Sequence, residues 1–219
     1  VSDPSHSYTS AGFFWEAMLR STGVKLELLT DPMQYKFFEQ SIRGGVYMVP
    51  NRVADGNNKY LKSYDETRES SYIMYLDANG LYASAMLEPL PVGGFKWLSA
   101  KKLEELEGRL ERGIPLPFGK GATLSVDLEY PKHLHHLHND YPLAPEKVVI
   151  NGVLKLTPNL GDKKRYVLTY EMLLYYLDHG LELTKVHRGI GYRKEPFLKP
   201  FIEFFYFFLL KSLLKHSKQ

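Results

Sequence analysis

Apolar residues recur at two spacings along the chain, and each spacing predicts a different kind of element. A helical spacing occurs in AKKLEELEGRLERG, where Leu103, Leu106 and Leu110 share a face, and in TYEMLLYYLDHG, which ends at Gly180. Similar patterns predict helices at about 11–22, 32–43 and 81–87, and in the apolar run after residue 196. Asp31 is a favourable N-cap for the second of these helices.

Alternating apolar and polar residues predict strands elsewhere. In ATLSVDLEYP, residues 122–131, every second residue is apolar, which is typical of a strand with one buried face. LTKVHRGIGYRK is predicted to be another strand, and SYIMYLD, residues 71–77, a buried strand that ends at Asp77. Because predicted strands and helices are intermixed and no internal repeat is present, we expect an α+β (mixed α/β) fold.

Composition narrows the class of protein. The chain has 219 residues, of which 44% are hydrophobic and 24% charged, as in globular proteins. Cysteine is absent, which excludes disulfide scaffolds, thiolate metal sites and cysteine nucleophiles and favours an intracellular protein. The apolar run Phe204–Leu210 is much shorter than the ~20 residues of a membrane span, so no membrane partner is expected.

Positive charge is concentrated in the second half of the chain. From Pro131 onward there are 14 Lys and Arg against 8 Asp and Glu, whereas the first part carries a net negative charge. Two clusters stand out: Lys163, Lys164 and Arg165 in GDKKRY, and Arg188, Arg193 and Lys194 in the predicted strand. Contact with a DNA phosphate backbone is one interpretation of these clusters, and an ordinary solvated surface is the other.

Asp77 places a carboxylate where a predicted buried strand stops. A turn at Asn79-Gly80 and a helix start follow at once. A carboxylate beside the free N–H groups of a helix start suits Mg²⁺-dependent phosphoryl or nucleotidyl transfer. The alternative is that Asp77 only caps the helix.

The order of motifs resembles family B DNA polymerases. YLDANGLYASAM, residues 75–86, resembles their motif A, and IRGG with VYMVPNRVA resembles the Tyr-x-Gly-Gly element of the protein-primed branch. Residues 127–146 and 166–204 resemble the segment that follows motif A. The resemblance spans about Tyr8 to Phe204 and is closest to the organellar, viral and transposon enzymes, which implies DNA-directed DNA polymerase activity and a partial palm with an antiparallel or mixed sheet.

This resemblance also implies roles for individual residues. Asp77 would be the catalytic aspartate that binds Mg²⁺, and the Ala78 carbonyl a further metal ligand. The N–H groups near Gly80, Leu81 and Tyr82 would meet the deoxynucleoside triphosphate, and the Tyr82 ring would exclude ribonucleotides. The template path would be lined by Arg43, Gly44 and Gly45. The implied partners are template and primer DNA, deoxynucleoside triphosphates and a terminal priming protein.

The resemblance divides the chain into four parts. Residues 1–45 would be a helical linker after an exonuclease domain, 46–121 a palm segment with motif A, and 122–200 an insertion near template and primer. Residues 201–219 form an apolar tail that differs from the family's approach to motif B, as a truncated or misread gene would produce. Motifs B and C, and with them the second carboxylate of a two-metal site, are not found, so we expect the chain alone to be inactive.

Two other functions stay open on the sequence. One is an inactive, transposon-derived nucleic-acid-binding module. The other is a metal-dependent nuclease, suggested by four histidines in KHLHHLHND: His133, His135, His136 and His138. Nuclear, organellar and viral settings are equally compatible with the sequence.

Overall fold

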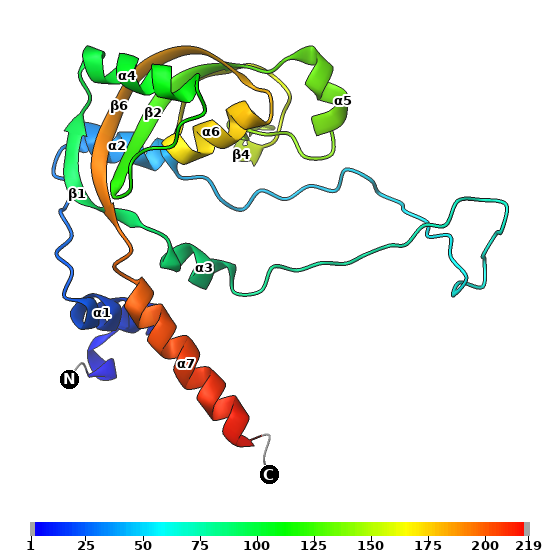
Figure 1. Cartoon of the computed structure of the whole chain (residues 1–219), viewed down its shortest axis with the longest axis horizontal. Helices are drawn as coiled ribbons and strands as arrows, with labels where there is room; N and C mark the ends of the chain where they lie inside the picture. The colour runs from blue at the N-terminus through cyan, green and yellow to red at the C-terminus, as the bar shows by residue number, and fades with distance from the viewer. Residues whose placement is uncertain (1–2, 217–219) are drawn as a thin grey trace.

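The computed structural model describes residues 3–216 and has an α+β fold (Figure 1). The α-helices are α1 (Ser10–Thr22), α2 (Pro32–Ser41), α3 (Leu81–Leu87), α4 (Ala100–Leu110), α5 (His135–His138), α6 (Tyr170–Asp178) and α7 (Lys199–His216), and short 3-10 helices are η1 (Pro4–His6) and η2 (Lys132–Leu134). The strands are β1 (Leu90–Trp97), β2 (Lys120–Glu129), β3 (Glu146–Ile150), β4 (Val153–Thr157), β5 (Lys163–Thr169) and β6 (Glu182–Glu195). The α+β class predicted from the sequence is confirmed.

Side chains at the helix ends explain where helices begin and stop. Asp31, Ser99 and Thr169 precede α2, α4 and α6, and each accepts a hydrogen bond from a first-turn backbone N–H. Gly23 ends α1 in the left-handed conformation, with φ 64°, which its lack of a Cβ allows. The cap predicted at Asp31 is thereby confirmed.

One antiparallel sheet has the strand order β1-β6-β2-β5, and β3 and β4 form a separate hairpin. The pattern of apolar and polar residues did not predict strand β1, because Pro91 and Gly93-Gly94 disfavour a regular strand. They are tolerated because β1 is an edge strand with register shifts at these positions. The pairing of β1 with β6 joins residues 90–97 to 190–195, across the expected domain boundary at residue 121.

Helices cover both faces of this sheet. On one face, Leu106 of α4 belongs to the same buried cluster as Leu124 of β2. On the other, Phe37 of α2 is buried with Ile190 of β6. The prediction that β2 has one exposed face is therefore wrong: this central strand is covered on both sides, and even its Thr123 is only 1% exposed.

A long excursion, residues 42–80, leaves the body of the fold between α2 and α3 (Figure 1). It includes residues 71–77, where the predicted buried strand is wrong. Only Ser71 forms a β-bridge, to Asn57, and the side chains of residues 72–76 are 64–93% exposed. A strand needs a neighbour for its backbone N–H and C=O groups, and no described strand lies beside this segment. Asp77 consequently does not lie at the edge of the sheet.

Two buried asparagines, Asn57 and Asn58, hold the tip of the excursion together through hydrogen bonds. Asn57 is 2% exposed, and its amide nitrogen donates to the carbonyls of Asp65, Arg68 and Glu69. Its amide oxygen accepts from the backbone N–H of Asp65. The tip is therefore an ordered turn, although it lies far from the sheet.

α7 lies below the sheet beside α1 and α3 (Figure 1). The rings of Phe14 and Phe205 join α1 and α7 edge to face, with centroids 5.7 Å apart. The helix predicted for the apolar run is confirmed. Among the helices of residues 3–216, none combines the length and hydrophobicity that a membrane span requires.

Candidate nucleic-acid interface

Asp127 of β2 lies between two irregularities of the sheet. Opposite it on β5, Lys164 and Arg165 occupy the space of one residue, because the pairing shifts between Val126/Tyr166 and Leu128/Lys163. On β6, His187 is the extra residue between two paired positions. Such β-bulges turn side chains out of the regular alternation. The bulges on both neighbouring strands therefore direct polar side chains toward Asp127.

The Asp127 carboxylate makes contacts with both bulges. Its Oδ1 accepts hydrogen bonds from the backbone N–H of Arg165 at 2.7 Å and from His187 Nε2 at 2.8 Å, and Lys164 Nζ lies 3.7 Å from Oδ2. These hydrogen bonds, that from Arg165 foremost, lower the pKa of Asp127 to about 2. The carboxylate is thus ionised at neutral pH and holds the irregular strands in place.

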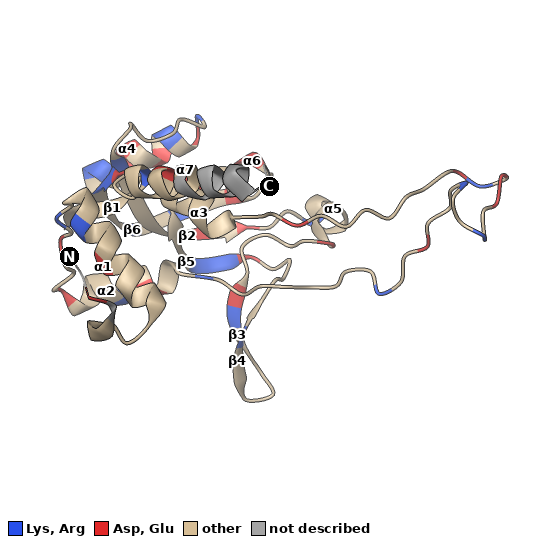
Figure 2. Ribbon diagram, turned by 90° about the horizontal axis from the view of Figure 1, so that it is seen from below, with Lys and Arg blue, Asp and Glu red and all other residues tan. Residues whose placement is uncertain are grey.

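A basic cleft of about 710 Å³ lies beside Asp127, between the end of α2, β5, β6 and the start of β3. Its cationic and imidazole lining is Arg43, Lys147, Lys164, Arg165, His187 and Arg188. Blue Lys and Arg positions are visible along β5 in Figure 2. Four residues predicted as DNA contacts from distant parts of the sequence, Arg43, Lys164, Arg165 and Arg188, are brought together here.

Arg43 is the most constrained cation of this cleft. Its Nη1 donates to the Val167 carbonyl at 2.6 Å, and its guanidinium lies 3.8 Å from the centre of the Tyr166 ring. Burial lowers the pKa of Arg43, but an arginine stays charged at neutral pH. Gly44 beside it lines two adjoining cavities, and Gly45 has φ 74°, a conformation that suits glycine.

Arg188 is positioned by aromatic rings. Its guanidinium carbon lies 5.0 Å from the ring centre of Phe37 and 5.1 Å from that of Trp97. These contacts hold the charged group at the surface of the sheet while it remains exposed. Arg188 can therefore offer its N–H donors to an anion without first losing much side-chain freedom.

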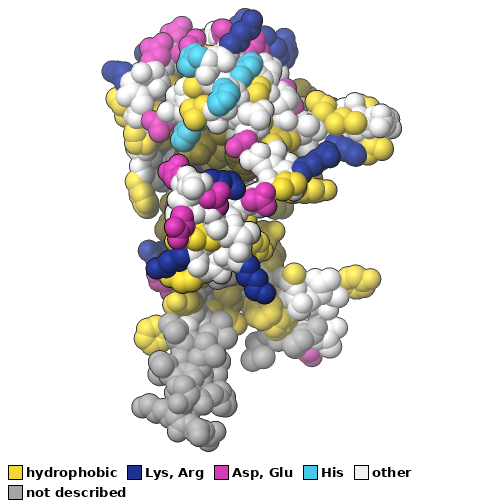
Figure 3. Space-filling model, turned by 90° about the vertical axis from the view of Figure 1, so that its right-hand side faces the viewer, with side chains coloured by type: hydrophobic (Ala, Val, Ile, Leu, Met, Phe, Trp, Pro, Cys, Tyr) yellow, Lys and Arg dark blue, Asp and Glu magenta, His cyan; other side chains and the backbone are white. Residues whose placement is uncertain are grey.

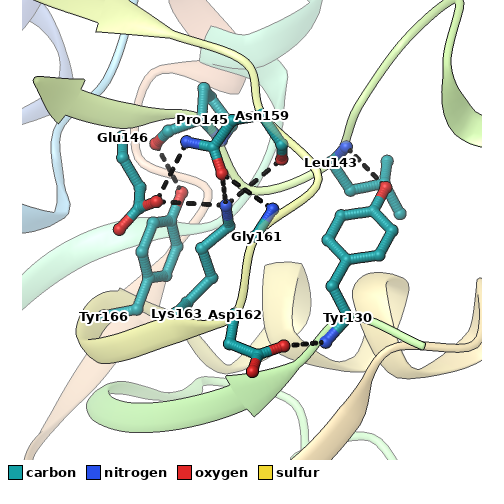
Figure 4. A network of polar contacts seen from close by, with 9 residues as sticks. All are labelled: Tyr130, Leu143, Pro145, Glu146, Asn159, Gly161, Asp162, Lys163 and Tyr166. Carbon is teal, nitrogen blue, oxygen red and sulfur yellow. Dashed lines mark hydrogen bonds and ion pairs between the residues drawn. The ribbon is translucent and has the colours of Figure 1, made fainter. Parts of the chain in front are cut away.

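The structure corrects the prediction that Lys163 contacts DNA. The side chain is fully buried, and its Nζ donates to Glu146 Oε2 at 3.1 Å and to Asn159 Oδ1 at 2.5 Å (Figure 4). Burial lowers the pKa of Lys163, and the hydrogen bond to Glu146 opposes this shift. Lys163 stabilises the fold between β5 and β3 and is not available to a ligand.

Arg193 and Lys194 lie at the far end of β6, outside the basic cleft. Lys194 Nζ is 2.7 Å from Glu171 Oε1, and Arg193 Nη1 is 3.7 Å from Glu195 Oε1. These two residues belong to the part of β6 that pairs with β1. The structure therefore does not bring them together with the other predicted DNA contacts.

The motif A residues are all exposed. Asp77, Ala78, Gly80, Leu81 and Tyr82 lie where the excursion returns to α3, and no other described residue makes a hydrogen bond or ion pair with the Asp77 carboxylate. The N-cap of α3 is Gly80, with φ 69° and no side-chain hydrogen bond. The alternative interpretation of Asp77 as a helix cap is therefore wrong.

The described residues do not fit a two-metal site by themselves. Within residues 3–216, no three His, Asp or Glu side chains are placed to hold a metal ion. Asp77 supplies one carboxylate, whereas two divalent ions require more than one. No catalytic step through Mg²⁺ follows from this arrangement.

Histidines gather on one surface of the molecule (Figure 3). Two of those in the KHLHHLHND segment bind to one tyrosine: His135 Nε2 lies 3.2 Å from the Tyr130 carbonyl, and His138 Nδ1 lies 2.9 Å from the Tyr130 hydroxyl. These contacts join α5 to the end of β2. These contacts explain the positions of His135 and His138 without a metal ion. They therefore lend no support to the metal-dependent nuclease hypothesis.

Asp127 and the tyrosines around Arg43 are site residues that the sequence reasoning missed. Asp127 follows the regular alternation of β2, so the pattern alone indicates an ordinary exposed polar position. One signal in the sequence could have helped: the three cations of GDKKRY directly precede an apolar run that could form a strand beside β2. The bulges that unite them are set by pairing between strands distant in sequence.

Comparisons with known proteins support the resemblance. No curated protein and no solved structure matches the chain. The family model described as DNA polymerase type B, organellar and viral, matches residues 6–212. Because this match extends over nearly the whole chain, the protein belongs to the organellar and viral type B DNA polymerases.

Proposed function

We propose that the chain holds template or primer DNA in the basic cleft, as the DNA-binding part of a type B polymerase. The observation that carries this proposal is the convergence of Arg43, Lys164, Arg165 and Arg188 on one cleft. Residues selected from the sequence as DNA contacts come from the end of α2 and from two different strands. In an ordinary solvated surface, by contrast, there is no reason for cations from separate parts of the chain to line the same cleft.

The cleft suits a phosphate backbone better than a single small anion. Its cations lie on several elements, and Asp127 and Glu146 offset only part of their charge. A chain of phosphates can contact such cations in succession and release the counterions that surrounded it. Binding that depends on charge more than on base identity follows from this arrangement.

For the transfer reaction, we propose Asp77 as one of the catalytic carboxylates and Ala78, Gly80, Leu81 and Tyr82 as its nucleotide-binding neighbours. The family assignment and the resemblance to motif A support this proposal. With one carboxylate in the site, the chain alone is expected to lack polymerase activity. A terminal priming protein is the priming partner that the resemblance implies.

A second candidate is a nucleic-acid-binding module without transfer activity. The exposed Asp77, which has no partner among the described residues, favours this candidate. Titration with a deoxynucleoside triphosphate in the presence and absence of Mg²⁺ separates the two. Mg²⁺-dependent nucleotide binding that Asp77→Asn abolishes supports the polymerase site, and its absence supports the module.

The DNA-binding proposal is tested by fluorescence anisotropy with a labelled primer–template over a range of salt concentrations. We expect affinity to fall steeply with salt. The combined change Lys164→Gln and Arg188→Gln should reduce the slope by about one for each phosphate that the variant no longer neutralises. Lys101→Gln, on the exposed face of α4, is the matched control and should leave the slope unchanged. Absence of binding at low salt would overturn the proposal.

A further inference from the structure

A second cavity, of about 590 Å³, adjoins the basic cleft and is lined by tyrosine rings. Tyr166 and Tyr176 form its buried part, with 5% and 7% of their surface exposed. Tyr141, from the loop after α5, and Tyr175 of α6 are 67% and 48% exposed. We call this cavity the tyrosine pocket. Its volume is that of a site for one small organic group.

The tyrosine pocket and the basic cleft share two residues, Arg43 and Tyr166. Since the Arg43 guanidinium stacks on the Tyr166 ring, the boundary between the two cavities is a cation lying on an aromatic face. An anionic chain in the cleft would therefore pass directly beside the aromatic pocket. Charge and aromatic surface are adjacent, as in grooves that bind single-stranded nucleic acid.

One wall of the tyrosine pocket, the loop of Ala144 and Pro145, is tied to the sheet without a ligand. The Tyr166 hydroxyl donates to the Pro145 carbonyl at 3.0 Å, which ties the loop to β5. In the same loop, Ala144 is fully buried with φ 52°, a conformation that residues other than glycine rarely adopt. Packing thus stabilises a backbone conformation of the loop that is unfavourable for an isolated chain.

We propose that the tyrosine pocket accepts an unstacked base of single-stranded DNA while the neighbouring phosphates lie in the basic cleft. This inference rests on the proposed DNA-binding function and specifies its substrate as a single strand. A tyrosine ring stacks on the face of any base, so the pocket would bind without sequence preference. In a duplex the bases are paired and stacked, so an intact duplex would contact the cleft alone.

The test compares two labelled single strands of equal length, an oligothymidylate and an oligonucleotide of abasic sites, together with a duplex. Both single strands carry the same phosphates, and only one carries bases. We expect the protein to bind the oligothymidylate at least about fivefold more tightly than the abasic strand, as stacking of one base implies. Replacing the rim rings by Tyr141→Leu and Tyr175→Leu should remove this preference and leave affinity for the duplex unchanged.

Two controls separate stacking from folding. Tyr175→Phe keeps the ring and should keep the preference for oligothymidylate. Tyr60→Leu removes a ring that is 78% exposed at the tip of the excursion and should have no effect. Equal affinity of the protein for both single strands would overturn the proposal that the tyrosine pocket binds a base. A preference for oligothymidylate that survives removal of both rim rings would overturn it as well. In either case, steep salt dependence would still support DNA binding in the basic cleft. If neither strand nor the duplex binds at low salt, the proposed function fails as well.

Discussion

Asp127 and His187 lie on adjacent strands and are joined by a hydrogen bond of 2.8 Å, and His187 also lines the basic cleft. The same carboxylate oxygen accepts the backbone N–H of Arg165 from the strand on the other side. One acidic side chain thereby fixes two bulges beside a cleft that is rich in cations. The acid serves the shape of the cleft, although its charge opposes that of an anionic ligand.

Asp127→Asn should lower the free energy of unfolding at neutral pH by about 1–2 kcal/mol, because charge-assisted hydrogen bonds become neutral ones. Since folding lowers the pKa of Asp127 from 3.8 to about 2, its stabilising contribution is complete above about pH 4 and is lost as the pH falls toward 2. Urea denaturation of both proteins between pH 7 and pH 2 measures this. A stability difference that stays constant over this range would contradict the assignment.

Lys163→Met should lower the free energy of unfolding by about 2–3 kcal/mol, because Glu146 and Asn159 lose their shared donor in a buried setting. Lys164→Met is the matched control, since the Lys164 side chain is 71% exposed, and should change stability by less than about 0.5 kcal/mol. Denaturation and DNA-binding measurements on both variants should give opposite patterns. Weaker DNA binding by Lys163→Met without a decrease in stability would refute the structural role.

Gly189→Ala should destabilise the protein by about 1–3 kcal/mol. A Cβ at this position of β6 would lie 2.5 Å from Leu124 Cδ2 and 3.0 Å from the Thr123 carbonyl oxygen. Gly108→Ala in α4 is the control, because a Cβ there meets nothing within 4 Å, and it should stabilise the helix by up to about 1 kcal/mol. Thermal denaturation of the two variants should shift in opposite directions, and a neutral Gly189→Ala would argue against the close packing of β2 on β6.

Asp77→Asn should leave stability within about 0.5 kcal/mol of the unmodified protein, because its exposed carboxylate has no partner among the described residues. In a polymerase chain that also carries motifs B and C, the same change should reduce nucleotide incorporation by orders of magnitude. Tyr82→Val in that chain should preserve deoxynucleotide incorporation and increase ribonucleotide incorporation, as primer-extension assays can measure. Normal extension by Asp77→Asn would refute the motif A assignment.

The helices and central strands could be predicted because their signals are local. Leu106 and Leu110 share a face of α4, and Asp31 caps α2. Burial of β2 on both faces could not be predicted in this way. The helix that packs on the second face of the sheet, α2, contacts the strands β5 and β6 on either side of β2 and lies more than seventy residues before β2 in the chain.

The errors at Lys163 and at residues 71–77 have a common cause. A lysine in a polar turn is predicted to be exposed, yet Glu146 and Asn159 enclose it. An apolar run such as residues 72–76 is predicted to be buried, yet nothing in the described fold pairs with it. In both cases the outcome depends on how other segments fold around the residue. Lys163 is buried because the chain at Asn159, only four residues away, and Glu146 of β3 fold onto it, and the apolar or polar pattern contains no information about such contacts.

The excursion of residues 42–80 has a consequence for how the protein can be altered. The hydrogen bonds between the strands of the four-stranded sheet lie within residues 90–195, outside the excursion. A longer excursion would therefore change the free energy of folding mainly through the entropy of closing a loop. Doubling a flexible loop costs only about 0.6 kcal/mol. We therefore expect the exposed segment at Val53 and Ala54, which precedes the hydrogen-bonded turn of Asn57, to tolerate insertion of a reporter domain, which would give a folded, labelled protein without disturbing the cleft.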